Sequence, residues 1–352
     1  MLRGSQSNQC TNTGKFPVGK QYSGRTKHWR QAEQYCNNYC RDLGAVPPAS
    51  ADFLPIPADT LALVSWNTQV GGTSTSPTAE RPPMVKAALS LLFAGTYQLM
   101  SAQEIPSSDS AELLRNLLPG GSTVWRDSFF DTTDTQDNGF WYRSGITLTE
   151  AAPLFVTQSR DSSGRIVTDP SRALHPPQMA YVTAGDFDFT LITLHLTFAD
   201  GDTAESVREF WVLLDWLDTY FNQPGHDPDV VICGDFNTPS RASGQTGRAG
   251  ITLDSVLEQG PRFQLGERRF TITVNEPTSR TSAASGGLPA NNYDHCLISA
   301  EALKEFIEAR RVDPAILTSD PSDPEVRLTS DHFPIVALFR THGSGIALDG
   351  KQ

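Results

Sequence analysis

The sequence predicts an α/β or α+β sandwich, in which β-sheets are flanked by helices. Three observations support this prediction. Apolar segments of strand length outnumber segments with helical spacing, and the two kinds are mixed along the chain. The composition, 38% hydrophobic and 19% charged over 352 residues, is typical of a globular protein with a sizeable core. No apolar run approaches the roughly 18 residues of a membrane span.

The first expected elements are a strand, a helix and a second strand. "TLALVSW" (60–66) is a continuous apolar run that indicates a buried strand. "MVKAALSLLFAG" (84–95) has apolar residues at helical spacing and stops at Gly95. "TYQLMSAQE" (96–104) is expected to be the second strand.

The middle of the chain, from about Pro106 to Ser171, is expected to be rich in loops. Within it, "GFWYRSGITL" (139–148) and "PLFVTQS" (153–159) have the aromatic and β-branched content of strands. The next segment, "PQMAYVTAGDFDFTLITLHLTF", reads as a hairpin of two strands.

The second half holds the clearest helix. In "TAESVREFWVLLDWLDTYF", one face of an amphipathic helix would carry Val207, Phe210, Trp211, Leu214 and Leu217. The remaining expected strands are apolar runs of similar length, at 228–237, 268–274, 293–299 and 334–339.

Residues 1–58 are expected to form a basic extension ahead of a domain at 59–341, with a short tail at 342–352. The extension holds seven Lys/Arg and three Asp/Glu, so its net charge is +4. Because the net charge of the whole chain is −12, the remaining residues carry −16. A short helix and then a proline-rich linker are expected in it. Two interpretations stay open: a solvated extension, or an arm that contacts a polyanion.

The cysteines do not indicate a disulfide framework, because the five are sparse and odd in number. Cys233 and Cys296 lie in apolar strands and are expected to be small core residues. Cys10, Cys36 and Cys40 leave open a zinc site or a bridge, although a fourth zinc ligand is not evident.

Charge and targeting signals limit the class of protein. A net charge of −12 argues against a protein that merely coats nucleic acid. The first residues lack an apolar signal segment, so a cytoplasmic location is the default expectation and secretion stays open. The sequence does not indicate an oligomeric state.

Isolated polar residues stand where the expected apolar strands meet loops. These residues are Asn67, Glu104, His195, Asp235, Asn237, Asp294, Asp331 and His332. Any one of them, taken alone, reads equally well as a turn, cap or structural polar residue. If the strands converge at one edge, all of them gather in one place, and together they favour a catalytic site.

The gathered side chains have a definite chemistry. Glu104, Asp331 and Asn67 offer hard oxygen ligands, which suit Mg²⁺ or Mn²⁺ and not zinc. His332, beside an acid, suits a general base. His195 suits a donor to an oxyanion or a leaving group. A divalent ion, a histidine base and neutral donors suit attack on a phosphate ester.

The ordered motifs "SWN", "QE", "LHL", "GDFN", "YDHCLIS" and "TSDHFPIV" resemble the endonuclease/exonuclease/phosphatase superfamily, the DNase I-like proteins, over about 59–341. The resemblance implies an α/β fold, a DNase I-like four-layer α/β sandwich of two packed mixed β-sheets flanked by helices. It also implies an active site at the strand ends. Short stretches such as "SWNTQVGG" and "LTSDHFPIV" are similar to the nuclease subunit of cytolethal distending toxins.

The resemblance also implies a metal site. In that role Glu104 would be the principal ligand of Mg²⁺, with Mn²⁺ as the alternative ion. Asn67 and Asp331 would assist it.

For catalysis, the resemblance implies a histidine base and in-line attack by water without a covalent enzyme intermediate. His332 would be the general base, oriented by Asp294. Asp235 and Asn237 would position water, metal and phosphate. His195 would stabilise the phosphate and help the leaving group.

The sequence departs from the family pattern at two places. Family members pair the histidine that matches His195 with a glutamate, and here only Asp134 or Asp137 is available. Many members hold the phosphate with an arginine, and here Arg172 or His175 must serve as the phosphate contact.

Three functions are compatible with these residues. The first is a metal-dependent nuclease, an endonuclease acting on DNA or RNA. The second is a phosphoesterase acting on lipid or small-molecule phosphoesters, similar to sphingomyelinases or inositol phosphatases. The third is a catalytically silent binding module, which the presence of every motif residue argues against.

Overall fold

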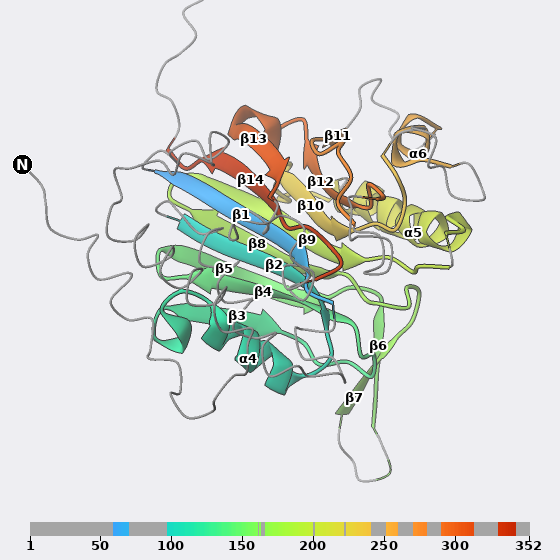
Figure 1. Cartoon of the computed structure of the whole chain (residues 1–352), viewed down its shortest axis with the longest axis horizontal. Helices are drawn as coiled ribbons and strands as arrows, with labels where there is room; N and C mark the ends of the chain where they lie inside the picture. The colour runs from blue at the N-terminus through green and yellow to red at the C-terminus, as the bar shows by residue number, and fades with distance from the viewer. Residues whose placement is uncertain are drawn as a thin grey trace, which may run out of the picture.

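The structure is a computed structural model that describes the core of the chain. It covers residues 59–69, 97–160, 162, 166–199, 201–221, 223–240, 251–259, 270–279, 290–312 and 330–342. The helix expected at 84–95, the extension 1–58 with its three cysteines, and nearly all of the tail lie outside these residues. The described part is a sandwich of two six-stranded sheets with helices outside (Figure 1), as the sequence predicted.

The first sheet is mixed. Its strands, in spatial order, are β13 (Phe306–Arg311), β14 (Ile335–Arg340), β1 (Thr60–Asn67), β2 (Tyr97–Ile105), β4 (Asp137–Arg143) and β3 (Trp125–Phe129). β1 runs parallel to β2 and antiparallel to β14. The carboxyl ends of β1 and β2 therefore lie at the same edge as the beginning of β14.

The second sheet is also mixed. Its strands, in order, are β11 (Phe270–Ile272), β12 (Asp294–Ser299), β10 (Val230–Asp235), β9 (Phe187–His195), β8 (Gln178–Ala184) and β5 (Ile146–Pro153). β9 and β10 are parallel, and β12 is antiparallel to β10. A separate hairpin, β6 (Val156–Arg160) and β7 (Ile166–Pro170), projects from the body (Figure 1).

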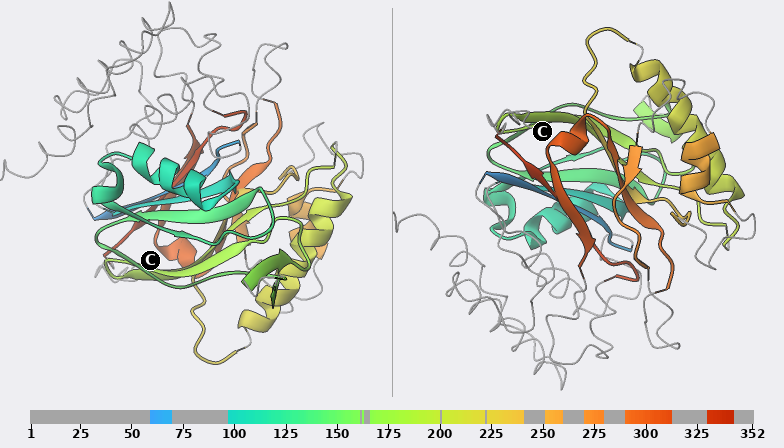
Figure 2. Two further views of the ribbon diagram at one scale, coloured as in Figure 1. Left: turned by 90° about the horizontal axis from the view of Figure 1, so that it is seen from below. Right: turned by 90° about the horizontal axis from the view of Figure 1, so that it is seen from above.

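Helices cover the two outer faces, which makes four layers (Figure 2). The helical segments are α4 (Ser108–Leu117), α5 (Ala204–Phe221), α6 (Leu253–Gln259) and the short 3₁₀ turns η2 (Gly121–Thr123) and η4 (Ala302–Lys304). Apolar residues of α4 pack on the first sheet, and those of α5 and α6 pack on the second. Among the described residues, no helix is long and apolar enough to cross a membrane.

The period-two alternation of strands explains how one strand serves two cores. Leu61 and Leu63 of β1 face the second sheet, whereas Val64 and Trp66 face the layer of α4. Such strands are buried on both faces, so they read as continuous apolar runs. The cysteines of β10 and β12 are cross-strand neighbours in the inner core and are both buried and free, which confirms the prediction for Cys233 and Cys296.

The prediction for the middle of the chain was wrong, because residues 106–171 hold regular structure. α4 begins after Ser107, whose hydroxyl accepts a hydrogen bond from the backbone of Ser110, and its short apolar stripe packs on the first sheet. The segment expected as one strand at 139–148 turns at Gly145, so that β4 lies in the first sheet and β5 in the second. The helix α4 was missed because its ten residues are too few for helical periodicity to stand out from the surrounding polar sequence.

Smaller differences concern strands and one helix face. β3, β7, β13 and α6 were not anticipated. On α5 the buried stripe includes Leu213 and Tyr220, and Trp211 is only partly buried at its margin. The helix therefore presents a broader apolar face to the second sheet than a five-residue stripe describes.

Candidate active site

Strand register places three of the predicted residues of the second sheet in one row. Asp235, the last residue of β10, pairs with His195 at the end of the parallel strand β9. On its other side it pairs with Asp294, the first residue of the antiparallel strand β12. Neighbours in register lie about 5 Å apart across a sheet, so the three side chains must crowd the same edge.

The first sheet contributes its residues to the same edge. Asn67 ends β1 and pairs with Gln103 of β2, which places Glu104 one step further along. The segment that carries Asp331 and His332 leads into β14, which runs antiparallel to β1. Nδ2 of Asn67 lies within hydrogen-bond distance of both Glu104 and Asp235, so the two sheets meet here.

A buried polar cluster fastens the sheets together directly behind this edge. The hydroxyl of Ser101 lies 2.6 Å from that of Thr193 on the opposite sheet. Nε2 of Gln103 donates to Ser101 at 3.0 Å and to Thr193 at 2.9 Å. Buried hydrogen bonds of this kind fix one relative position of the sheets, because sliding them would leave polar groups without partners.

Unusual backbone conformations at three positions help to place the side chains of the site. Gly234 has φ of 141°, and a Cβ there would lie 2.0 Å from the carbonyl oxygen of Leu194. This explains the glycine of "GDFN": only glycine lets β10 approach β9 so closely before Asp235. Glu104 and Asn237 have φ of 61° and 46°, a conformation that costs free energy in residues other than glycine and often occurs at functional sites.

The centre of the site is the buried carboxylate of Asp235. Its Oδ2 accepts a hydrogen bond from Nδ2 of Asn67 at 3.0 Å. The same oxygen lies 3.6 Å from Nε2 of His332 and 3.8 Å from Nε2 of His195. Glu104 approaches from the other side: its Oε1 lies 2.9 Å from Nδ2 of Asn67 and 3.8 Å from Nε2 of His195.

His332 is paired with Asp294, as the resemblance implied. Nδ1 of His332 lies 2.8 Å from Oδ2 of Asp294. Burial alone would lower the pKa of His332, but the carboxylates of Asp294 and Asp235 outweigh burial and raise that pKa well above 6.5. Burial raises the pKa of Asp294 to about 6, although the charge of His332 opposes that rise.

Two residues that the sequence analysis did not identify hold this pair in place. The hydroxyl of Thr278 accepts a hydrogen bond from the backbone N–H of Asp294 at 2.8 Å. The hydroxyl of Ser330 donates to the backbone carbonyl of Asn67 and accepts from the N–H of His332, at 2.7 and 3.0 Å. The position of Ser330, two residues before His332, is a signal that could have been recognised, because serine often bonds the backbone two residues on.

The surroundings of His195 differ from the family pattern. Neither candidate aspartate contacts it: Asp134 lies 2.5 Å from Nδ1 of His175, and Asp137 accepts two hydrogen bonds from Thr132. The ring of His175 instead stacks on that of His195, with centroids 4.7 Å apart and planes 9° from parallel.

The electrostatics of His195 follow from this arrangement. Nδ1 of His195 is buried and has no hydrogen-bond partner among the described residues. Burial lowers the pKa of His195, against the charges of Asp235 and Glu104, so the ring is neutral near pH 7.

The remaining predicted residues are placed differently. The backbone N–H of Asn237 donates to Oδ1 of Asp235 at 2.9 Å, and its side-chain amide donates to the carbonyl of Leu196. Asp331 is exposed as a residue, but its carboxyl group lies toward the site: burial of that group raises its pKa, the charge of His332 opposes the rise, and the charges of Glu104 and Asp235 add to it. Arg172 is exposed, and no contact recorded for the described residues joins it to the cluster.

The acids offer two groupings for a cation. One consists of Glu104 and Asp331 with Asn67, although the oxygen of the Asn67 amide accepts from the backbone of Gln69 and its nitrogen faces the acids. The other consists of Asp235, Asp294 and His332, whose ligand atoms lie within 4.8 Å of one another. Both groupings are rich in carboxylate oxygens, which hard divalent cations prefer.

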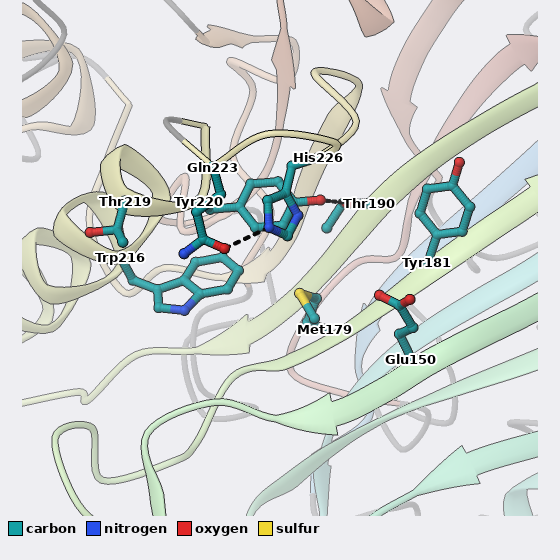
Figure 3. Close-up of a pocket in the computed structure, with 9 residues that line it drawn as sticks. All are labelled: Glu150, Met179, Tyr181, Thr190, Trp216, Thr219, Tyr220, Gln223 and His226. Atoms are coloured by element: carbon teal, nitrogen blue, oxygen red, sulfur yellow. Dashed lines mark hydrogen bonds between the residues drawn. The ribbon is translucent and has the colours of Figure 1, made fainter.

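A separate pocket lies between α5 and strands of the second sheet (Figure 3). Trp216 and Tyr220 of α5 line one side of it, and Met179 and Glu150 line the other. Thr190 of β9 also lines it, with its hydroxyl within hydrogen-bond distance of the Tyr220 hydroxyl, and none of the lining residues belongs to the acid and histidine cluster. The pocket is therefore distinct from the acid and histidine cluster.

Comparisons with known proteins agree with the fold. The model of the Endonuclease/Exonuclease/phosphatase family matches residues 64–332. A structure of humanized D. rerio TDP2 is 14% identical, with a TM-score of 0.52, and covers 80% of this chain and 99% of its own. D. rerio TDP2 complexed with a single-strand DNA product is 15% identical, with a TM-score of 0.52, and covers 80% and 98%.

A bacterial protein of the same family has a similar fold. An endonuclease/exonuclease/phosphatase family protein from Bacteroides thetaiotaomicron is 14% identical, with a TM-score of 0.50, and covers 79% of this chain and 94% of its own. No curated protein sequence matches this chain. The narrower similarity to the cytolethal distending toxin subunit stays a prediction.

Substitution of Gly234 tests how the strand end is shaped. Gly234→Ala should lower the free energy of unfolding by about 2 kcal/mol or more, because alanine disfavours this φ and its Cβ would collide with Leu194. Gly201→Ala is the matched control, since Gly201 also has positive φ but open space around it. Urea unfolding of both variants measures the difference, and equal losses would contradict the close approach of β10 to β9.

Asp137 should make stability depend on pH. Burial raises its pKa from 3.8 to about 6, so the folded state binds more protons than the unfolded state between these values. Stability from this group is present below about pH 4 and falls as pH rises through 6, by up to about 3 kcal/mol. Asp137→Asn should flatten this part of the profile of unfolding free energy against pH. If the profiles of the wild type and of Asp137→Asn ran parallel, the raised pKa of Asp137 in the folded state would be refuted.

Proposed function

This chain belongs to the Endonuclease/Exonuclease/phosphatase family, and on that premise we propose that it hydrolyses phosphodiester bonds with a divalent metal ion. Within that class, a nuclease that cuts DNA or RNA internally is the function the site supports best. The observation that carries the proposal is the convergence of Glu104, Asn67 and the two histidines on Asp235.

The residues at this edge fit a divalent cation. Nδ2 of Asn67 donates to both Glu104 and Asp235, so two carboxyl groups lie close together at this edge, and carboxylate oxygens are the ligands that hard divalent cations prefer. Glu104 would be the principal ligand, with Asp331 and Asn67 beside it. When bound, Mg²⁺ or Mn²⁺ would polarise a phosphate oxygen and neutralise developing charge.

His332 is proposed to accept the proton of the attacking water. Asp294, 2.8 Å from Nδ1, holds the ring so that Nε2 faces the site and stabilises the imidazolium that forms. The carboxylates that raise the pKa of His332 include Asp235, which would also lie beside a bound cation. Cation binding and release of a proton from His332 are therefore coupled.

The other residues orient and stabilise. Asp235 would align the water between the two histidines, held by the N–H of Asn237 and the amide of Asn67. His195, neutral because burial lowers its pKa, would donate a hydrogen bond to a phosphate oxygen or to the leaving group. His175, stacked on His195 and paired with Asp134, is the proposed phosphate contact, with exposed Arg172 as the alternative.

Nucleic acid is the proposed substrate class. The similar fold of D. rerio TDP2 is seen with a single-strand DNA product, which supports this choice without deciding it. The basic extension, 1–58, would add phosphate contacts to an otherwise acidic protein. A phosphoesterase of lipids or small molecules is the alternative.

One experiment tests the substrate class directly. The full chain is incubated with supercoiled plasmid, single-stranded RNA, a phospholipid and a phosphoinositide, each with Mg²⁺ or with EDTA. We expect nicked plasmid or shortened RNA with Mg²⁺ only. Cleavage of a lipid and not of nucleic acid would favour the phosphoesterase alternative over the nuclease proposal. Cleavage in EDTA would contradict the proposed dependence on a metal ion.

Glu104→Gln tests which acids bind the metal. The variant keeps the size of the side chain but removes its charge, so Mg²⁺ should bind about 100-fold more weakly, with little change in melting temperature. Titration calorimetry with Mg²⁺ measures the affinity. Glu112→Gln, the same change at an exposed side chain of α4, is the control. Wild-type affinity in Glu104→Gln, with loss in Asp294→Asn, would move the metal to the grouping of Asp235, Asp294 and His332.

The two histidines should both be needed for turnover. His332→Ala and His195→Ala should each lower kcat about 100-fold or more, the usual contribution of a general base or of an oxyanion donor. His226→Ala, at an exposed histidine in the separate pocket, should leave kcat unchanged. If both active-site variants turned over like the wild type, the chemistry would have to lie elsewhere.

A further inference from the structure

Two large apolar side chains are exposed beside the active-site edge. Leu174 and Phe198 are 55% and 54% exposed, the highest values among the described large hydrophobic residues. Leu174 immediately precedes His175, and Phe198 follows His195 by three residues. Each therefore lies on a loop that leaves the stacked pair of histidines.

A single buried carboxylate fixes both loops. Glu209 of α5 accepts hydrogen bonds from the backbone N–H of Leu174 at 2.9 Å and from that of Thr197 at 2.8 Å, one on each oxygen. It also accepts from the hydroxyl of Thr197 at 2.8 Å. The backbones that carry the two apolar side chains are thus held close together, so the side chains share a rigid support.

The ring of Phe198 is also placed against the catalytic row. It packs at a tilt on Tyr293, with ring centroids 6.3 Å apart. Tyr293 directly precedes Asp294; burial raises the pKa of Tyr293, and the nearby charge of Asp235 adds to that rise. One edge of Phe198 is therefore anchored beside the acids, while the rest of the ring meets solvent.

Resting on the proposed function, we propose that Phe198 and Leu174 form a stacking platform for an unpaired nucleobase next to the scissile phosphate. A phosphate held at Asp235 and the two histidines places its neighbouring base near this platform. Aromatic rings stack on any base, so the platform selects single-stranded or locally opened nucleic acid without reading its sequence.

The size of the surface favours a base over a lipid. Two exposed side chains offer apolar area on the scale of one base, whereas binding to a bilayer surface requires a broad apolar face with basic residues around it. A lipid acyl chain is therefore the outcome that the test must exclude.

The test uses the full chain and two short single-stranded oligonucleotides. Each has one cleavable phosphodiester among uncharged methylphosphonates, and its flanking nucleotides carry either bases or abasic units. We expect the wild type to cleave the base-bearing substrate with a kcat/KM about 10-fold higher or more. Phe198→Ala should abolish most of this preference, Phe198→Trp should keep it, and Leu174→Ala should reduce it.

Ile307→Ala is the control, because Ile307 is 37% exposed at the end of β13 that pairs with the far end of β14. It should behave like the wild type. Equal loss on both substrates in Phe198→Ala, or no preference in the wild type, overturns the platform while leaving the nuclease proposal intact.

If the wild type cleaves neither oligonucleotide and also leaves plasmid and RNA intact, the nuclease proposal fails; in either case the platform is then tested by binding with fluorescence anisotropy in Mg²⁺. Equal affinity for the base-bearing and abasic strands then overturns it. Sedimentation with phosphatidylcholine vesicles that is lost in Phe198→Ala would assign the surface to lipid and overturn the platform as well.

Discussion

The buried carboxylate of Asp235 lies where both sheets end, and the surrounding site depends on its compensation. A buried charge without partners is costly, so the fold must supply donors or a cation. Here it supplies the amide of Asn67 from the first sheet, the N–H of Asn237 and two histidines. Glu104 and Asp331 bring further carboxyl groups to the same edge. This gathering of carboxylate oxygens is the physical reason to expect a divalent ion, and the charges of Asp294 and Asp235 also raise the pKa of His332.

Much of this arrangement could be predicted from the sequence because strand ends are visible as polar residues after apolar runs. β1, β2, β9, β10, β12 and β14 were all expected, and each brings a site residue to the same edge. The register that aligns Asp235 with His195 and Asp294 follows once these strands are neighbours in one sheet. Predicting which strands are neighbours required the family resemblance, because nothing local in the sequence specifies strand order.

The rest could not be predicted because it depends on contacts between distant segments. The stacking of His175 on His195 joins the loop before β8 to the end of β9, and nothing in the sequence spacing of the two histidines indicates this contact. Glu209 looks like an ordinary charged position of an amphipathic helix, yet it is buried and holds two loops. α4 and β3 were missed because short elements in a polar region carry weak periodic signals.

The central claim is that one cation belongs between the two sheets, at Glu104 and beside Asp235. Anomalous diffraction from crystals soaked in Mn²⁺ measures its position directly. The account predicts an anomalous peak at a coordination distance of about 2.1 Å from a carboxylate oxygen of Glu104, on the side that faces Asp235. A peak held by Asp294 and His332 instead, or no peak at this edge, would contradict it.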